Sequence, residues 1–409
     1  MIDTGSTAFI IICATYVFLM TPGLAFFYGG LSQKKNVVNT MMMSFFIMGL
    51  ASVLWVLFGY SLSFSGDIGG FIGNLGWFGF SGVGAEPGPY SDVIPNSCFA
   101  IFQMMFAIIT PALITGAVAG RMRFKAIFFF IFFWLFIVYF PMAHMVWGGG
   151  FLAQLGSVDF AGGNVVHISS GVTGLVLAIM LGKRKAAKKQ TLIPHNIPYV
   201  VLGAALLWFG WFGFNGGSAL AADGLAIHAI ITTNTSAACA MLSWMLIDVI
   251  KDGKPTLVGA CTGAVVGLVA ITPGAGFVPV WASFIIGALV SPICYFAVSV
   301  LKNKFGYDDA LDAFGCHGIG GIWGGIATGL FAQSSINPVA QWNGLVFGDY
   351  RLFLAQVISI VVTIALAIVG TFICAGIVKL ITPLRVSEDD ENIGLNDSEH
   401  GETAYSLFD

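Results

Sequence analysis

Hydrophobic residues fill long stretches of the chain, separated by short polar breaks. A hydrocarbon core about 30 Å thick needs about 20 apolar residues for each helical crossing. Eleven stretches approach or exceed that length, and we predict a helix for each. They run over 7–31, 36–61, 94–119, 124–144, 161–182, 196–217, 224–250, 256–273, 276–301, 311–334 and 347–381. The pattern predicts an all-α polytopic membrane protein with eleven transmembrane helices, the last of them long.

The amino-acid composition agrees with this pattern. Hydrophobic residues make up 57% of the chain and charged residues 9%, whereas soluble domains carry about 25% charged residues. So few charges cannot cover a water-soluble surface. The 53 glycines indicate tight packing, because small residues let membrane helices approach one another. We therefore expect the whole apolar part of the chain to lie in a lipid bilayer.

Lysine and arginine gather beside alternate span ends. These residues accumulate near span ends on the cytoplasmic side of a membrane. With eleven spans, sixteen of the seventeen basic residues lie on one side, Lys188 and Lys189 among them, and only Arg351 lies on the other. An error of one span would destroy this pattern. The N-terminus is therefore predicted outside and the C-terminus inside.

The chain divides into a membrane part and a polar end. Residues 1–385 hold every predicted span, and residues 386–409 are polar and acidic. We predict a transmembrane domain over 1–385 and a cytoplasmic tail over 386–409. The seven cysteines lie in or beside apolar spans without CxxC spacing. We expect free, packed thiols rather than disulfides or a zinc site.

Two echoes along the chain indicate an internal repeat. Residues 26–30 (FFYGG) end the first span, and residues 212–217 (FGFNGG) end the sixth. His167 in span five precedes serines and a glycine, as His317 in span ten precedes glycines. Each pair is five spans apart, so its members enter the membrane from opposite sides. This predicts an inverted repeat of spans 1–5 and 6–10, with span 11 outside the pairing.

The predicted spans hold almost no ionisable groups at mid-membrane. Asp159 lies at the outer edge of span five, where it suits a helix N-cap, and Asp248 and Asp312 lie toward inner ends. Without a mid-membrane carboxylate, a sodium or divalent-metal site is unexpected. His167 and His317 remain near mid-span, one in each half. Intramembrane ionisable residues mark a pathway or relay by default.

A facing histidine pair would line a narrow pore with polar nitrogen and little charge. Burial disfavours the charged imidazole, and a neutral ring can both donate and accept, so the pair could relay a proton. The alternative is that each histidine only satisfies a packing hydrogen bond. We interpret the other four histidines as structural or solvated: His144 and His195 as structural, His228 and His400 as solvated.

The predicted outer side is acidic and rich in aromatic residues. Its segments carry seven acidic residues against Arg351 alone: Asp3, Asp67, Glu86, Asp92, Asp159, Asp223 and Asp349. Such a field raises the local concentration of cations. Aromatic faces can hold a small, partly desolvated cation, and the candidates near outer span ends are Phe102, Phe106, Trp147 and Phe214, with Ser218 as a hydroxyl acceptor. The alternative is an ordinary interfacial aromatic belt.

Four strings in this order strongly resemble the ammonium transporter (Amt/Mep/Rh) family, and its bacterial Amt type in particular. They are AHMVWGGG at 143–150, DFAGGNVVH at 159–167, GWFGFNGGS at 210–218 and FGCHG at 314–318. The likeness runs from the first span to the tail without a large unmatched insert. It implies a homotrimer in the plasma membrane, in which each subunit has its own pore and no enzymatic activity.

The resemblance also implies a role for each candidate residue. The outer ammonium site would comprise Phe102, Phe106, Trp147 and Ser218, with Asp159 as its structural support. Phe106 and Phe214 would form a gate above the pore and proton relay, His167 and His317. Ammonium would lose its proton at the outer site, and ammonia would continue through the pore while the proton is relayed separately. No cofactor, metal or nucleic acid is implied.

Three other functions are compatible with parts of the sequence. A neutral channel for ammonia or carbon dioxide, of the Rh type, would not need the cation site around Trp147. An ammonium sensor would signal through a partner or a fused domain, which this chain does not show. An intramembrane metalloenzyme using both pore histidines would need further ligands, and the chain has no HExxH string.

The tail and two local departures from the family pattern bear on regulation and rate. Residues 398–405 (SEHGETAY) resemble the tail of bacterial Amt proteins, which implies a PII-type regulatory partner; a disordered tail is the alternative. Asn164 stands where family members often carry threonine or serine. Met104 and Met105 are bulkier than the pair found in some relatives. We expect these departures to affect rate or gating rather than substrate.

Overall fold

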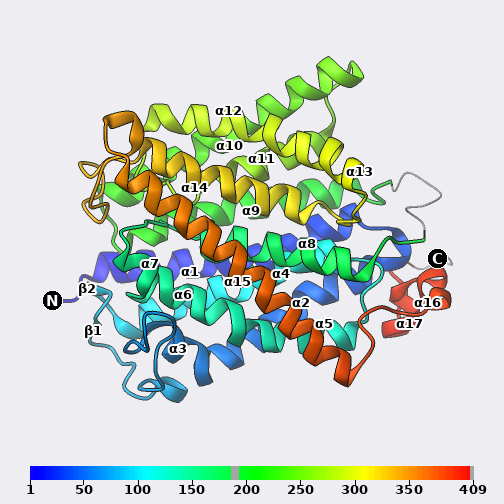
Figure 1. The fold of residues 1–409 in the computed structure, drawn as a ribbon, viewed down its shortest axis with the longest axis horizontal. Helices are drawn as coiled ribbons and strands as arrows, with labels where there is room; N and C mark the ends of the chain where they lie inside the picture. Colours follow the sequence, from blue (N-terminus) through cyan, green and yellow to red (C-terminus); the bar gives the residue numbers. More distant parts are fainter. Residues whose placement is uncertain (186–192, 406–409) are drawn as a thin grey trace.

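The computed structural model describes residues 1–185 and 193–405. Lys188 and Lys189, which contribute to the orientation argument, lie outside the described residues, as do the last four residues of the predicted tail. Within the described part, the helices run side by side between two ends of the molecule (Figure 1). We call the end that holds the N-terminus the outer end and the end that holds the tail the inner end, following the predicted orientation.

Every predicted hydrophobic stretch coincides with a helix. The first half contains α1 (Thr4–Leu31), α2 (Val37–Leu54), α3 (Tyr60–Phe64), α4 (Asn96–Val118), α5 (Phe124–Trp134), α6 (Phe140–Trp147), α7 (Phe151–Gln154) and α8 (Ser169–Leu181). The second half contains α9 (Ile197–Gly216), α10 (Gly224–Asp252), α11 (Leu257–Ile271), α12 (Val280–Phe296), α13 (Lys302–Phe305) and α14 (Ile319–Phe331), followed by α15 (Arg351–Ile381).

Nine helices in the described ranges are long and apolar enough to cross a membrane. The remaining two predicted spans correspond to α11, which has 15 residues, and to the glycine-rich segment from Phe314 to Phe331. Both are largely buried among other helices. The prediction of a multi-pass helical membrane protein is confirmed, with nine spans rather than eleven meeting these criteria.

Five helices contain a π-helical turn, in which one extra residue widens the coil. The turns are η2 (Trp55–Gly59), η4 (Leu135–Tyr139), η5 (Gly163–Ile168), η8 (Ala297–Leu301) and η9 (Phe314–Gly318). Turns of this kind are rare in proteins overall, and those that occur often lie at functional sites. Two of them, η5 and η9, carry His167 and His317.

A small hairpin interrupts the helical architecture at the outer end. Strands β1 (Pro87–Gly88) and β2 (Ser91–Pro95) pair antiparallel in the segment between α3 and α4. The hydroxyl of Tyr90 donates to the Phe64 carbonyl at 2.7 Å, and the N–H of Asp3 donates to Val93 at 2.8 Å. The hairpin was not predicted, because strands of two and five residues leave no mark in a pattern of long apolar stretches.

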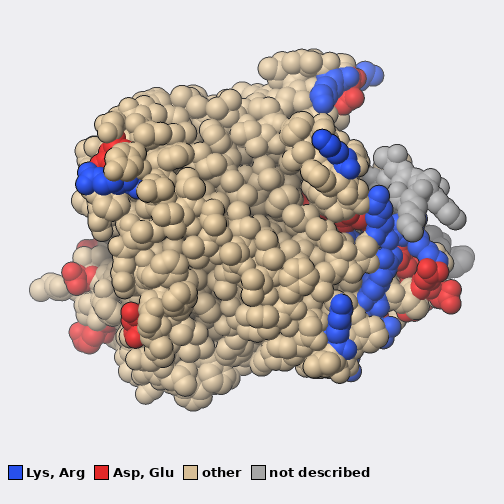
Figure 2. Space-filling model, in the orientation of Figure 1, with Lys and Arg blue, Asp and Glu red and all other residues tan. Residues whose placement is uncertain are grey.

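Charged side chains occupy the two ends and leave the middle bare. On the face drawn in Figure 2, a row of lysine and arginine residues follows the inner end, and a broad uncharged belt separates it from the outer end. Arg351, the one basic residue predicted on the other side, is the first residue of α15, at the outer end, and pairs with Asp349 at 2.6 Å. This distribution is typical of a protein whose middle lies in lipid.

The tail packs against the inner end through two short helices, α16 (Glu388–Ile393) and α17 (Leu395–His400). Arg385 pairs with the buried Glu391 at 2.6 Å, and Asn396 accepts the N–H of Val38 at 2.9 Å. His400 lies against Phe124 and within 2.9 Å of Asn39. The interpretation of His400 as solvated is therefore wrong, because α17 holds it against the helices.

Candidate functional site

Three hollows follow one another between the two ends of the bundle. An outer cavity has a volume of about 420 Å³, and an inner one of about 210 Å³. Between them lies a space of about 10 Å³ beside His167 and His317. The middle space is about the size of one water molecule, so a hydrated ion does not fit there.

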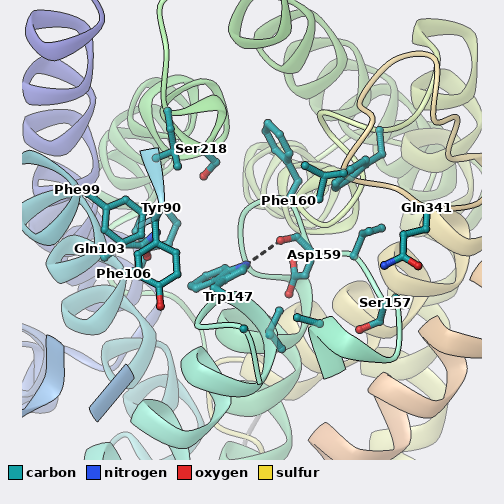
Figure 3. A pocket seen from close by; sticks show the side chains of 18 residues that line it. Tyr90, Phe99, Gln103, Phe106, Trp147, Ser157, Asp159, Phe160, Ser218 and Gln341 are labelled. Carbon is teal, nitrogen blue, oxygen red and sulfur yellow. Dashed lines mark hydrogen bonds between the residues drawn. The ribbon is translucent and has the colours of Figure 1, made fainter. Parts of the chain in front are cut away.

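The outer cavity collects several of the predicted site residues. Phe106, Trp147, Asp159 and Ser218 line it, coming from three separate parts of the chain (Figure 3). The indole N–H of Trp147 donates to the Asp159 carbonyl at 2.8 Å, which sets the plane of the ring. The Ser218 hydroxyl donates to the Phe214 carbonyl at 2.8 Å. Its oxygen lone pairs therefore remain available to accept from a ligand.

Phe102 lies behind the cavity wall rather than in it. Its side chain is fully buried, and its ring meets that of Phe106 edge to face, with centroids 5.0 Å apart. A Cβ on Gly217 would lie 2.7 Å from the Phe102 ring, so this glycine admits the ring. The structure thus places Phe102 where it supports Phe106 and does not line the cavity.

The prediction from the sequence missed other lining residues, Tyr90, Phe99 and Gln103 among them. Phe99, Gln103 and Phe106 are spaced i, i+4 and i+7 along α4, so the helical period could have revealed them. Tyr90 gave no such signal, because it comes from the β hairpin. Its ring stacks on Phe99 with centroids 5.1 Å apart and planes 11° apart.

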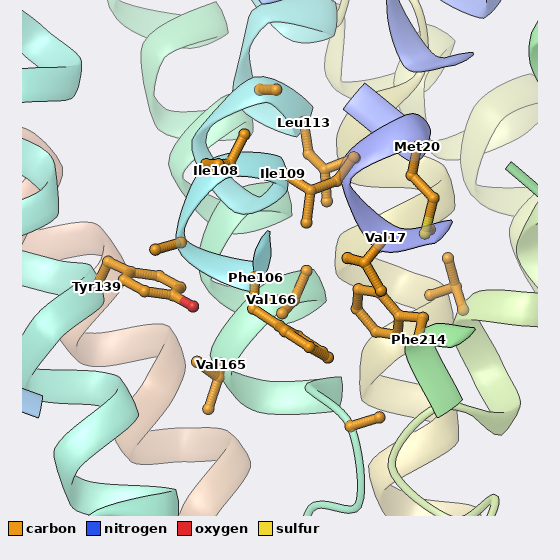
Figure 4. Packing of buried hydrophobic residues seen from close by; sticks show 14 of the residues in the cluster. Val17, Met20, Phe106, Ile108, Ile109, Leu113, Tyr139, Val165, Val166 and Phe214 are labelled. Carbon is orange, nitrogen blue, oxygen red and sulfur yellow. The ribbon is translucent and has the colours of Figure 1, made fainter. Parts of the chain in front are cut away.

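Below the outer cavity, the rings of Phe106 and Phe214 close the passage. Their centroids are 4.4 Å apart, and each side chain is 1% exposed. Figure 4 shows both rings among aliphatic side chains from several helices. The space beneath them is walled by Met20, Leu24, Ile109, Leu113, Val166, Leu207 and Trp211, together with the two histidines. Such a lining offers almost no ligand for an ion.

His167 and His317 contact each other through their ring nitrogens. The two Nδ1 atoms are 3.3 Å apart, and the ring planes are inclined by 18°. In this contact one Nδ1 must donate and the other accept, so the neutral pair shares a single proton between these atoms. The Nε2 atom of His167 is buried without a hydrogen-bond partner in the described structure. The predicted juxtaposition of these residues is present.

The two histidines occupy matching positions in the two halves. Each lies in a π-helical turn, eight residues after an aspartate: Asp159 before His167 and Asp309 before His317. The Asp159 carboxylate accepts four backbone N–H groups, those of residues 162–165. Asp309 accepts two, from Ala313 and Phe314. The repeated Asp-x7-His spacing was not among the predicted echoes and strengthens the case for a repeat.

The two capping aspartates differ in their surroundings. Burial raises the pKa of Asp159, and the four backbone donors offset part of that rise. Burial, followed by the nearby Asp312, also raises the pKa of Asp309. Asp312 lines the inner cavity and pairs with Lys302 at 2.7 Å. The inner cavity therefore carries charges of both signs, since Arg184 lines it as well.

The residues that depart from the expected motifs are buried beside the site. Asn164 donates its side-chain amide to the Ser359 hydroxyl on α15 at 2.8 Å. Met104 and Met105 are buried next to Phe106 on α4. None of these side chains lines the three cavities.

Metal binding finds no support in residues 1–185 and 193–405. No group of three histidine, cysteine or acidic side chains in that part of the chain could hold a metal ion. The seven cysteines are free, and six of them are buried. The geometry instead suits passage of a small molecule. The outer cavity offers aromatic faces and a hydroxyl oxygen, and the passage beneath is narrow and apolar apart from the two histidines.

The chain is similar to known proteins in sequence. The model of the Ammonium Transporter Family matches residues 8–405. An ammonium transporter of Bacillus subtilis is 55% identical over 401 residues, which cover 98% of each chain. The ammonium transporter Amt1 of Archaeoglobus fulgidus is 46% identical over 403 residues, 98% of this chain and 99% of that one.

Solved structures give the same picture. Mep2 of Saccharomyces cerevisiae superposes with a TM-score of 0.88 at 39% identity, over 95% of this chain and 88% of that one. A structure described as a sensor Amt protein superposes with a TM-score of 0.88 at 28% identity, over 97% of this chain and 98% of that one.

Proposed function

The chain belongs to the ammonium transporter family, and we propose that it carries ammonium nitrogen across the plasma membrane through the route described above. The family consists of transporters rather than enzymes. The relatives described as ammonium transporters support this substrate. The succession of an aromatic cavity, a closed gate and a dry passage supports a mechanism in which the cation does not cross intact.

In the proposed mechanism, ammonium enters the outer cavity and exchanges water for aromatic faces and the Ser218 oxygen. Trp147 and Phe106 supply the faces, and Phe102 holds Phe106 in place. The ion releases one proton there, because the passage below offers no ligand for a full charge, and this proton is relayed separately by way of His167 and His317. Ammonia then passes the gate of Phe106 and Phe214. Sodium and potassium have no proton to lose and would forfeit their hydration without replacement ligands.

The observation that carries this proposal is the contact between His167 and His317. Two neutral imidazoles 3.3 Å apart in an otherwise apolar passage offer ammonia a free ring nitrogen. When the donor ring takes up a proton at its Nε2, its Nδ1 proton can pass to the second ring, which then releases a proton from its own Nε2. The alternative of two independent packing histidines is disfavoured, because the Nε2 atom of His167 is buried without a partner among the described residues.

The membrane topology belongs to the same proposal. We propose eleven crossings, with the N-terminus outside, the C-terminus inside, and spans 1–5 and 6–10 forming an inverted repeat. The matching aspartate-capped histidine turns support the repeat. Helix α11, at 15 residues about 22 Å long, is short for a crossing. Its burial among neighbouring helices supports including it, because it need not match the lipid thickness itself.

Current on a solid-supported membrane tests the mechanism. Proteoliposomes of the wild type, of His167→Ala/His317→Ala and of a control, His228→Ala, meet an ammonium pulse. We expect a saturable positive current from the wild type and the control, none with sodium or potassium, and loss of the current in the double variant. Wild-type vesicles that show internal alkalinisation without current would instead indicate a neutral ammonia channel.

We further propose that the protein is a homotrimer in which each subunit has its own pore. Residues 386–409 form a regulatory tail in this proposal. The close fit of α16 and α17 to the inner end supports an ordered tail rather than a disordered one. A PII-type protein is the proposed partner, and full binding of such a protein by tail-deleted transporter would argue against that role.

The resemblance to a sensor Amt protein raises a second candidate function, which is ammonium sensing. Loss of signalling in a variant with intact flux would reveal it.

A further inference from the structure

Helix α15 stands outside the repeat, yet it contacts the first histidine turn and shares a buried cluster with the second. It runs diagonally across the face of the bundle in Figure 1. Ile360 of α15 forms a small buried cluster with Ile168 and Val172, which follow His167. Phe314, at the start of the second histidine turn, packs against the same cluster. One helix therefore contacts the first turn of the proposed relay and the cluster against which the second turn packs.

One turn of α15 closer to the outer end, the side chain of Gln356 makes two hydrogen bonds to the backbone of Val158. Its side-chain oxygen accepts the Val158 N–H at 2.8 Å, and its amide donates to the Val158 carbonyl at 2.9 Å. Gln356 is 1% exposed. The amide also makes a longer hydrogen bond to the Gly325 carbonyl at 3.5 Å. The two shorter bonds both go to Val158, which restrains that residue in position and in rotation.

Three residues further along α15, Ser359 makes a second contact with the same segment. Its hydroxyl oxygen accepts the side-chain amide of Asn164 at 2.8 Å, and the Asn164 N–H donates to Asp159 at 2.7 Å. Gln356 and Ser359 lie on one face of the helix, since residues three apart are neighbours there. Together they hold residues 158 and 164, the two ends of the turn that surrounds Asp159.

This turn, residues 158–164, orients the proposed site in two directions. Toward the outer cavity, the Asp159 carbonyl accepts the Trp147 indole N–H at 2.8 Å, and Val158 and Asp159 line the cavity itself. Toward the pore, the Asp159 carboxylate caps the turn that carries His167. A displacement of the turn would therefore move the Trp147 ring and the start of the histidine turn together.

We propose that Gln356 is a positioning residue for transport, which sets the affinity of the outer site by holding the Val158–Asp159 backbone and, through it, the ring of Trp147. Ser359 assists by anchoring Asn164. The inference rests on the proposed function, because it assigns Trp147 to the outer ammonium site. It identifies a contribution of α15 that lies 198 residues away in sequence from Val158.

Transport kinetics of Gln356→Leu and Gln356→Glu, compared with the wild type, provide the test. Gln356→Leu removes both hydrogen bonds to Val158 and the longer one to Gly325. We expect the half-saturating ammonium concentration to rise about ten-fold while the maximal current stays within about two-fold, since small displacements at a binding site cost affinity of this order. The control is Thr371→Val, which removes a hydroxyl contact between α15 and Thr173 at 3.2 Å without touching the turn.

Gln356→Glu adds a second readout, the pH dependence of the half-saturating concentration. A purely structural role of Gln356 would not produce this dependence. The ionised carboxylate can accept the Val158 N–H but cannot donate to its carbonyl. At low pH, where the new carboxyl carries its proton, the donor returns. We expect the half-saturating concentration of this variant, divided by that of the wild type at the same pH, to fall as the pH is lowered. The ratio for Gln356→Leu should stay constant.

Three outcomes would overturn the inference: kinetics identical to the wild type in both variants, a loss confined to maximal current, or a pH-independent ratio for Gln356→Glu. Ammonium-dependent thermal stabilisation of the purified protein gives an independent measure of affinity, with the same expected weakening in Gln356→Leu. If the wild type carries no current but shows this stabilisation, the proposed transport mechanism fails while the role of Gln356 is still decided. If the wild type shows no stabilisation either, the inference fails as well.

Discussion

The contribution of a polar side chain to stability depends on its burial and on the groups that its atoms contact. The Asp159 carboxylate is 7% exposed and meets four backbone N–H groups. Asp223, the N-cap of α10, is exposed and accepts two backbone N–H groups. Both residues cap a helix, yet only Asp159 is buried beside the proposed pore. The same residue type therefore contributes very different amounts of free energy at the two positions.

Replacing Asp159 with Asn should destabilise the protein strongly. The variant puts a neutral side chain, whose NH2 group cannot accept, against buried N–H donors. Because hydrogen bonds to a charged group are worth about 1.5–3 kcal/mol each, we expect a loss of at least about 3 kcal/mol, seen as a lower apparent melting temperature in detergent. Asp223→Asn is the matched control and should cost less than about 0.5 kcal/mol, since Asn caps helices as well as Asp. Equal shifts for the two variants would contradict this account.

Between elements, the decisive contact is the crossing of α8 with the second histidine turn. A Cβ on Gly171 would lie 2.3 Å from the backbone nitrogen of Gly318 and 3.1 Å from the carbonyl carbon of His317. Only a residue without a side chain lets these backbones come so close. This approach brings His317 within reach of His167.

Gly171→Ala should therefore separate the histidine pair. The clash is with backbone, which cannot rotate away, so we expect a destabilisation of about 1–3 kcal/mol together with loss of the ammonium current. Gly49→Ala in α2 is the control, because no atom lies within 4 Å of its added Cβ; it should stabilise the helix by up to about 1 kcal/mol. Normal current from Gly171→Ala would show that the crossing is not needed for transport.

A second contact between elements joins the two halves at the inner end. Arg184, just after α8, pairs with Asp308, which leads into the second histidine turn, at 2.7 Å. Burial alone would raise the pKa of Asp308, but Arg184 and the nearby Arg121 lower it from 3.8 to about 2. Since the folded-state pKa lies below the unfolded one, the stability from this pair is present above pH 4 and is lost as the pH falls toward 2.

Melting curves at several pH values should show this loss. The shift corresponds to about 2 kcal/mol. We expect Asp308→Asn to melt below the wild type by a constant margin from pH 7 to about pH 5, and the margin to shrink as the pH falls further. The difference between the two proteins isolates this group from the other carboxyls. A margin that is unchanged down to pH 3 would contradict the pairing.

At the scale of the whole molecule, charge separates the two ends. Basic residues follow the inner end in Figure 2, and the tail packs on that end. Acidic residues dominate the segments at the outer end, where the large aromatic cavity lies. This asymmetry agrees with a molecule that collects a cation on one side and keeps its basic side in the cytoplasm.

Cysteine labelling with a membrane-impermeant maleimide tests the orientation. Glu86→Cys and Lys254→Cys lie in exposed loops at the outer and inner ends. In intact cells we expect labelling of Glu86→Cys alone, and of Lys254→Cys only after permeabilisation. Both variants carry Cys239→Ala, because Cys239 is the one native cysteine that is not buried; this background by itself should stay unlabelled. The reverse pattern would invert the topology.

The sequence by itself determined the helices and pointed to several residues of the candidate site. Long apolar runs and the position of basic residues are local properties, so each predicted span from α1 to α15 is found as a helix. Phe106, Trp147 and Ser218 stood out because of their chemistry near span ends, and the structure brings them to one cavity. His167 and His317 stood out because an ionisable group is costly inside a membrane.

Only the tertiary structure decided how these residues meet. The contact between the two Nδ1 atoms joins residues 150 apart, and the bond from Gln356 to Val158 joins residues 198 apart. Phe102 was predicted in the outer site and lies behind it, while Tyr90 entered the cavity from an unpredicted hairpin. Such contacts depend on the angle and distance at which remote helices cross. The angle and distance are set by the packing of the whole chain. Small residues such as Gly171 contribute because the absence of a side chain lets two backbones approach closely.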